Sequence, residues 1–146
     1  MTSTNSTSNQ NHSKLKVLIV DDMPQVRQDL HQLLELTGIF EIVAEAGDGL
    51  EAIRQADKLS PDAIVMDLEM PGLNGYEATR LIKARNPTIR VIILSAYAGP
   101  EEMQRAQWAG ADGFVTKGNH YEILVNAILG KNDSPNLYNS KRGEGS

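Results

Sequence analysis

The stretch Lys16-Val17-Leu18-Ile19-Val20 is a short apolar run that ends on the acidic pair Asp21-Asp22. Three later runs end on a polar residue in the same way: Ala63-Ile64-Val65-Met66 before Asp67, Val91-Ile92-Ile93-Leu94 before Ser95, and Gly113-Phe114-Val115-Thr116 before Lys117. All four are short and rich in β-branched side chains, which favours strands over helices. In an open parallel sheet the strands end at one shared edge, where ligands bind, so we expect the four polar ends to meet there.

Segments with helical periodicity separate the strand-like runs. We expect helices from about Pro24 and over residues 49–59, 76–85, 100–109 and 121–129, and a further strand over 41–46. The apolar residues of the second helix recur every three positions, at Leu50, Ile53, Ala56 and Leu59. The strand at 41–46 alternates in polarity, which is typical of a half-covered edge strand, and the strand at 63–66 is expected at the centre. Five strands alternating with five helices predict an α/β fold with a doubly wound, five-stranded parallel sheet.

Length and composition limit the remaining possibilities. The chain has 146 residues, a net charge of −5, no cysteine and no run of Lys or Arg. This suits one domain and gives no support for direct binding to nucleic acid or anionic lipid, for disulfides or for zinc-thiolate sites. No apolar stretch approaches the ~20 residues of a membrane span. Residues 1–13 lack the features of a signal peptide, so we expect a disordered tail and a cytoplasmic protein.

The polar strand ends predict a site for a metal ion and a phosphoryl group. Asp21, Asp22 and Asp67 would bring three carboxylates together, and a hard divalent cation such as Mg²⁺ is the simplest way to neutralise them. Lys117 adds a positive charge, and Ser95 adds a hydroxyl donor. The sequence contains no P-loop, so the carboxylate itself is the expected acceptor of phosphate. Asp67 has the best position, because it follows the predicted central strand.

These motifs resemble the receiver domain of two-component response regulators. The resemblance covers Lys14 to Leu129 and rests on four motifs: Val-Asp-Asp at 20–22, Met-Asp-Leu-Glu-Met-Pro-Gly-Leu-Asn-Gly at 66–75, Leu-Ser-Ala at 94–96, and Gly-Ala-Asp-Gly-Phe-Val-Thr-Lys-Gly at 110–118. It implies a flavodoxin-like sheet of strand order 2-1-3-4-5 and a receiver domain at residues 14–130. It also implies a signalling protein, not an enzyme, that accepts a phosphoryl group on Asp67 from a sensor histidine kinase.

The resemblance also implies roles for the other polar residues. Mg²⁺ would be held by Asp22, Asp67 and the backbone carbonyl of Glu69, with Asp21 acting mainly through a metal-bound water. Lys117 would pair with the phosphoryl oxygens, and Ser95 would move to hydrogen-bond one of them. Because the side chain of Glu69 adds negative charge beside the acceptor, we expect an altered lifetime of the phosphoryl group.

In the receiver family that the sequence resembles, the conformational switch uses two residues. One carries a hydroxyl group, and the other is an aromatic residue three positions before the lysine. Here these are Ser95 and Phe114. Phe114 lacks the hydroxyl of a tyrosine, so Tyr97 is a second candidate for the polar aromatic. The simpler interpretations are that Ser95 caps a helix and that Phe114 is a core residue.

Lys117-Gly118 and the stretch Ser-Ala-Tyr-Ala at 95–98 resemble the NarL/LuxR group, whose output is a helix-turn-helix DNA-binding domain. Residues 131–146 have the composition of a linker or tail, so we expect that output domain to be absent. DNA binding would need that domain, and a stand-alone receiver acting through protein contacts is the alternative. The resemblance also implies possible dimerisation on phosphorylation, through the first and fifth helices.

Two other classes fit parts of the sequence. Asp67-Leu68-Glu69 has the spacing of a haloacid dehalogenase nucleophile, although that family requires Asp as its second acid. Residues 47–52 fit the Gly-x-Gly-x-x-Ala pattern of a dinucleotide site, but the strand before them is not the first. The three histidines lack metal-ligand spacing and are assigned to the tail or the surface; they are His12, His31 and His120. Trp108 is expected to be a partly exposed helix residue.

Overall fold

The structure of the protein is a computed structural model that describes residues 13–131. Apart from Ser13 and Lys131, the tails predicted at 1–13 and 131–146 lie outside the described residues. The strands are β1 (Leu15–Val20), β2 (Phe40–Ala46), β3 (Ala63–Asp67), β4 (Arg90–Ser95) and β5 (Gly113–Thr116). The helices are α2 (Pro24–Leu36), α3 (Gly49–Leu59), α4 (Gly75–Arg85), α5 (Pro100–Ala109) and α6 (Tyr121–Leu129).

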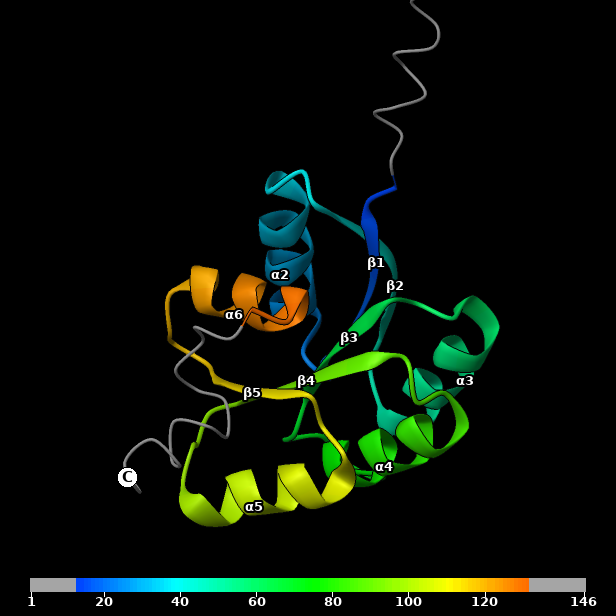
Figure 1. Ribbon diagram of the computed structural model, residues 1–146, viewed down its shortest axis with the longest axis vertical. Helices are drawn as coiled ribbons and strands as arrows, with labels where there is room; N and C mark the ends of the chain where they lie inside the picture. The colour runs from blue at the N-terminus through cyan, green and yellow to red at the C-terminus, as the bar shows by residue number, and fades with distance from the viewer. Residues whose placement is uncertain (1–12, 132–146) are drawn as a thin grey trace, which may run out of the picture.

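The five strands form one parallel sheet of order β2-β1-β3-β4-β5. This confirms the predicted doubly wound α/β fold and its strand order. β2 lies at one edge and β3 at the centre, as the polarity of their sequences predicts. Figure 1 shows α2 and α6 on one face of the sheet and α3, α4 and α5 on the other.

Alternation along β1 fills both layers of the core. Val17 and Ile19 belong to the apolar cluster with α2 and α6, whereas Leu18 and Val20 belong to the cluster with α3 and α4. All four are at most 1% exposed, so the strand is covered on both faces. This explains why its sequence is a continuous apolar run and not an alternating one.

The helix starts are defined by local chemistry. Pro24 opens α2, and the side chains of Asp48 and Asn74 accept backbone hydrogen bonds at the starts of α3 and α4. The apolar face expected for α3 is wrong at one position, because Leu50 is 62% exposed. The buried residues of that helix are Gly49, Ala52 and Ala56, whose spacings of three and four follow the helical period of 3.6 residues and not a period of three.

Candidate functional site

Strand register brings the polar strand ends together at the carboxyl edge of the sheet. Val20 of β1 is level with Met66 of β3, so Asp21 and Asp67 follow side by side. Ser95 ends the neighbouring strand β4 and is level with Thr116 of β5, which immediately precedes Lys117. The backbone N–H of Lys117 donates to the Ser95 carbonyl at 2.7 Å and fixes the lysine at this edge.

Asp67 is the central group of the site. It is 1% exposed, and Nζ of Lys117 lies 2.9 Å from its Oδ1 atom. Within residues 13–131, neither carboxylate oxygen of Asp67 has a partner in hydrogen-bond geometry. A buried carboxylate is normally saturated with hydrogen bonds, so Asp67 keeps acceptor capacity for a ligand.

The electrostatics of the pocket follow from one lysine among several acids. Burial raises the pKa of Asp67 to about 6, the pairing with Lys117 opposes this rise, and the nearby charge of Asp21 adds to it. Burial acts to lower the pKa of Lys117, but the neighbouring carboxylates of Asp67, Asp21 and Glu69 together outweigh that effect and the pKa is raised. Lys117 therefore stays charged at neutral pH and is shared, because Oδ2 of Asp21 also lies 3.5 Å from its Nζ.

Three carboxylates form a group that suits a hard cation. One oxygen from each of Asp21, Asp22 and Asp67 lies within 4.8 Å of the others, with Asp22 exposed and the other two buried. Oδ1 of Asp21 already accepts the backbone N–H of Met23 at 2.9 Å. The unsatisfied oxygens of Asp67 and the oxygen-only donor set fit Mg²⁺.

Ser95 contacts a residue whose side chain the sequence had not linked to it. The buried Oγ of Ser95 donates to Oε2 of Glu69 at 3.0 Å and accepts the backbone N–H of Tyr97 at 3.1 Å. The other carboxylate oxygen of Glu69 lies 3.9 Å from Nζ of Lys117. The side chain of Glu69 thus accepts the Ser95 hydroxyl and lies near the ammonium group of Lys117. The resemblance assigns both of these groups to contacts with a phosphoryl group.

The two aromatic switch candidates lie in different surroundings. Phe114 is fully buried in the cluster that also holds Leu68, Tyr76 and Ile93, whereas Tyr97 is 66% exposed. The simpler interpretation of Phe114 as a core residue therefore describes its position. Its role in a switch, and that of Tyr97, stay predictions.

Sequence reasoning missed a basic residue that supports the acidic edge. Arg27 of α2 donates through Nη1 to the backbone carbonyl of Asp21 at 2.6 Å and through Nε to Glu45 at 3.1 Å. His31, assigned to the surface from its spacing, is partly exposed, and its Nδ1 lies 2.8 Å from Glu45. The signal in the sequence is an arginine in the first turn of the helix that follows Asp21-Asp22.

The fold and site together have the features of a response regulator receiver. A model of the "Response regulator receiver domain" family matches residues 17–129, and the chain belongs to that family. It is 40% identical over 113 residues to the nitrate/nitrite response regulator protein NarP of Escherichia coli, covering 77% of this chain and 53% of NarP. It is 38% identical over 114 residues to the response regulator protein VraR of Staphylococcus aureus, covering 78% of this chain and 54% of VraR.

Solved structures agree with this assignment. A LuxR-family response regulator from Aurantimonas superposes with a TM-score of 0.77 at 33% identity, covering 89% of this chain and 99% of that one. The receiver domain of the putative regulator NarL from Mycobacterium tuberculosis gives a TM-score of 0.76 at 31% identity, covering 80% and 94%. These relatives confirm the NarL/LuxR subtype. The chain spans about half the length of the curated relatives it matches.

The features behind the two alternative classes have local explanations in this fold. Gly49 lies so close to the loop before α4 that a Cβ atom there would be 2.6 Å from the Leu73 carbonyl, so packing alone accounts for glycine in the dinucleotide-like pattern. The carboxylate of Glu69, the second acid of the dehalogenase-like pair, accepts the Ser95 hydroxyl.

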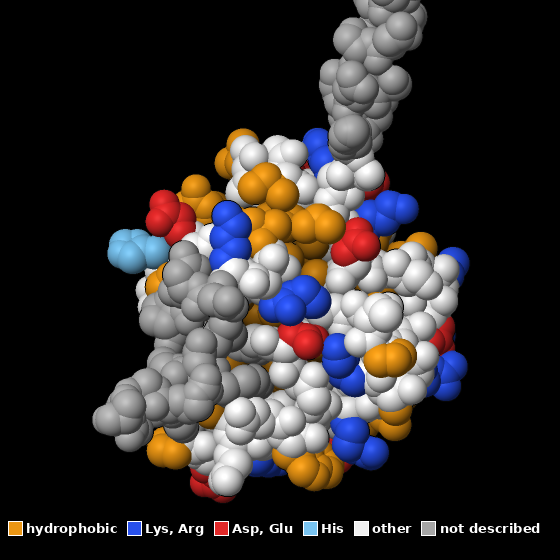
Figure 2. Space-filling view, in the orientation of Figure 1, with side chains coloured by type: hydrophobic (Ala, Val, Ile, Leu, Met, Phe, Trp, Pro, Cys, Tyr) orange, Lys and Arg blue, Asp and Glu red, His pale blue; other side chains and the backbone are white. Residues whose placement is uncertain are grey.

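Within residues 13–131, no helix has the length and apolar composition to cross a bilayer. Figure 2 shows basic and acidic side chains mixed over the visible face, without one continuous basic stripe.

Proposed function

We propose that this receiver domain is a phosphorylation-dependent switch in which Asp67 accepts a phosphoryl group from a sensor histidine kinase in the cytoplasm. The observation that carries the proposal is the state of Asp67, which is buried, paired with Lys117 at 2.9 Å and free of hydrogen bonds from the described residues. An ionised carboxylate in this condition is an available nucleophile.

The transfer forms one bond and breaks one. A carboxylate oxygen of Asp67 attacks phosphorus, the phosphorus–nitrogen bond of the kinase phosphohistidine breaks, and the imidazole leaves with the bonding electron pair and takes up a proton. The product is an acyl phosphate on Asp67. The domain supplies the nucleophile, Asp67, and is itself modified by the transfer. It therefore assists its own phosphorylation without being an enzyme.

The neighbouring side chains stabilise the charge that develops on the transferring oxygens. Mg²⁺ would be held by Asp22, Asp67 and the Glu69 carbonyl, with Asp21 acting through water, and would supply positive charge to those oxygens. Nζ of Lys117 is already directed at the attacking carboxylate and neutralises a second oxygen. The Ser95 hydroxyl leaves Glu69 and donates to the phosphoryl group, which makes Ser95 the first reporter of the modified state.

Phosphorylation with acetyl phosphate and Mg²⁺ tests this function. We expect the intact mass to rise by one phosphoryl group, and we expect Asp67→Asn to abolish the rise. Asp29→Asn is the matched control, because Asp29 is an exposed aspartate on α2, and it should be phosphorylated like the wild type. Equal phosphorylation of Asp67→Asn and the wild type would contradict the assignment, and chelation of Mg²⁺ should stop the reaction in both active proteins.

The switch would control transcription as the receiver part of a LuxR-type regulator. The support is the match to NarP and VraR over about half of their length, with DNA contacts left to an output domain. A homodimer through α2 and α6 would accompany phosphorylation. Sizing with and without beryllofluoride tests the dimer, and an unchanged monomer would favour the alternative of a stand-alone receiver that acts through other proteins.

A further inference from the structure

An open pocket of about 260 Å³ lies beside the site and extends from Glu69 to the first turns of α5. Tyr76 of α4 and Arg105 of α5 line it, together with Tyr97 from the loop after β4. The pocket therefore lies between Glu69, which accepts the Ser95 hydroxyl, and helix α5. Tyr76 and Arg105 have no role in the chemistry described above.

Tyr76 joins α4 to α5 by two polar contacts. Its hydroxyl donates to the backbone carbonyl of Glu102 at 3.2 Å, and the Arg105 guanidinium lies 4.4 Å from the centre of its ring. The side chain is 7% exposed and packs in the same apolar cluster as Phe114. A cation over a largely buried ring is a favourable contact, so both interactions hold α5 against α4.

The start of α4 is packed directly against the phosphoacceptor. A Cβ atom at Gly75 would lie 2.5 Å from the backbone carbonyl of Asp67, so no larger residue fits between the two segments. Tyr76 is the next residue along the chain. The close contact between Gly75 and Asp67 therefore lies one peptide unit from Tyr76, which in turn contacts α5.

Among the described residues, the two aromatic switch candidates Phe114 and Tyr97 lie in surroundings that differ from those of Tyr76. Phe114 is fully buried and has no hydroxyl, so it has no polar contact to exchange. Tyr97 is 66% exposed. We propose that Tyr76 and Arg105 form a latch that holds α5 in its resting position and opens when Asp67 is phosphorylated. The latch rests on the proposed function, because its opening is assigned to phosphorylation.

The latch has a quantitative consequence for ligands that select the activated state. A ligand that binds only the activated arrangement has an apparent affinity proportional to the fraction of protein in that arrangement. Destabilising the resting arrangement raises this fraction and raises the affinity by the same factor. Loss of one hydrogen bond or one cation–π contact corresponds to about a three- to tenfold change. Beryllofluoride with Mg²⁺, a mimic of the phosphoryl group, is the probe.

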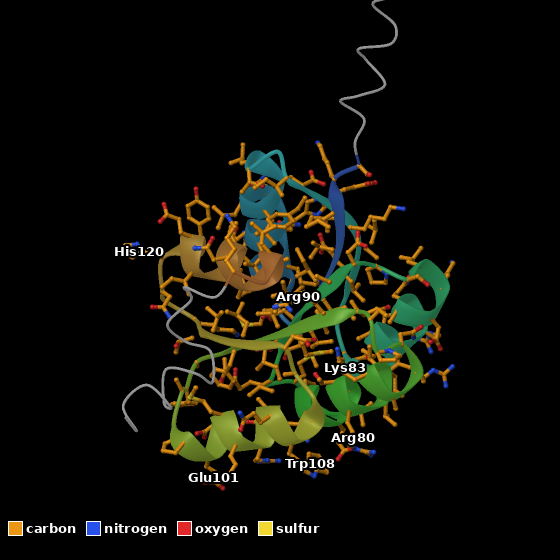
Figure 3. All side chains as sticks on the ribbon, in the orientation of Figure 1. Arg80, Lys83, Arg90, Glu101, Trp108 and His120 are labelled. Atoms are coloured by element: carbon orange, nitrogen blue, oxygen red, sulfur yellow. The ribbon has the colours of Figure 1, made fainter. Side chains whose placement is uncertain are left out.

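Trp108 reports on α5 without any added label. It is the one tryptophan of the chain, it lies on α5 and it is 66% exposed. The guanidinium of Arg80, from α4, lies 5.6 Å from its ring, and Figure 3 shows the two side chains next to each other. Movement of α5 relative to α4 changes this contact and with it the fluorescence.

The test is a beryllofluoride titration followed by Trp108 fluorescence. We expect Tyr76→Phe and Arg105→Gln to bind about three- to tenfold more tightly than the wild type and to show part of the emission change before ligand is added. Tyr121→Phe, the same hydroxyl deletion on α6, is the control and should match the wild type within about twofold. Unchanged or weaker binding by both latch variants overturns the proposal, as does tighter binding by Tyr97→Phe in their place.

Hydrogen–deuterium exchange of the α5 amides separates the latch from the phosphorylation chemistry. Without ligand, exchange should be faster in Tyr76→Phe and Arg105→Gln, and unchanged exchange contradicts the latch whatever the titration gives. If exchange is faster but beryllofluoride has no effect on the wild type, or has the same effect on Asp67→Asn, the proposed function fails and the α4–α5 contact stands.

Discussion

Among residues 13–131, the two lysine–aspartate pairs with the shortest contacts differ in what surrounds them. Nζ of Lys83 is 2.8 Å from Asp112, and Nζ of Lys117 is 2.9 Å from Asp67. Lys83 also donates to two backbone carbonyls, and Asp112 also accepts the backbone N–H of Val91. Lys117 instead lies among carboxylates, and Asp67 has no partner in hydrogen-bond geometry among the described residues.

The difference separates a structural pair from a reactive one. At the start of β5, Asp112 and Lys83 satisfy each other and hold the ends of α4, β4 and β5 together. At the carboxyl edge, one ammonium group is shared by several acids, so a carboxylate remains that can take up a cation or a phosphoryl group. Similar distances between lysine and aspartate therefore occur in a structural pair and in a reactive pair. The hydrogen-bond capacity that remains on the carboxylate distinguishes the two.

Removing the lysine at the reactive pair should have the largest effect. We expect Lys117→Met to slow phosphorylation by acetyl phosphate about 100-fold, because the developing charge loses its closest cation. Lys83→Met should keep the wild-type rate. Intact-mass time courses measure both, and a similar loss in the two variants would remove the distinction between the pairs.

Removing the lysine at the structural pair should instead reduce stability. Lys83→Met leaves two carbonyls and Asp112 without their cation, which should lower the free energy of unfolding by about 2–3 kcal/mol. The side chains of Lys83 and Asp112 are 17% and 26% exposed, so solvent replaces only part of the lost contacts. Urea unfolding measures the change, and a loss below about 0.5 kcal/mol would show that the pair is dispensable.

Removing the acceptor charge should stabilise the protein when Mg²⁺ is absent. The pKa of Asp67 is about 6 in the folded state against an ordinary value of 3.8, so its ionised form disfavours folding. This cost is complete above pH ~6 and disappears as the pH falls through 6 toward 3.8. Asp67→Asn should therefore be more stable than the wild type by about 1–2 kcal/mol at pH ~8, with a difference that shrinks in acid. Unfolding in EDTA at several pH values measures it, and a destabilised variant at high pH would contradict the electrostatic account.

Glu69 should have the smallest effect, because it acts on the hydroxyl and not on the acceptor. Glu69→Asn removes the charge that competes for Ser95, so we expect phosphorylation about fivefold faster and a changed rate of dephosphorylation. Asp22→Asn is a useful comparison, since loss of a proposed metal ligand should slow the reaction. Equal rates of gain and loss of phosphate in Glu69→Asn and the wild type would refute a role for this side chain.

The sequence was sufficient to predict the fold and the meeting of the polar strand ends. Runs such as Ile64-Val65-Met66 are typical of strands covered on both faces, as in a parallel sheet between helices, and the acids that follow such strands share one edge. Leu50 was placed wrongly because recurrence every three residues does not distinguish the buried face of a helix from its flank. The backbone contact of Arg27 with Asp21 depends on one rotamer of a long side chain.

The residues of the site could be predicted from the sequence more readily than the contacts between them. The hydrogen bond from Ser95 to Glu69 joins the end of β4 to the loop after β3, and its formation depends on loop conformation that no periodicity encodes. The burial of Phe114 and the α5 contacts of Tyr76 likewise depend on how α4 and α5 pack. Residue types and spacing thus predict which groups meet, whereas the tertiary structure determines which of them are already satisfied.

Borohydride reduction of the phosphorylated protein tests the central claim most directly. Borohydride converts an aspartyl phosphate to homoserine, and peptide mass spectrometry then locates the modified residue. We predict homoserine at position 67 and unmodified aspartate at 21, 22 and 112. Reduction at Asp21 or Asp22, or a phosphorylated protein that borohydride does not modify, would contradict the assignment of Asp67 as the buried carboxylate that receives the phosphoryl group.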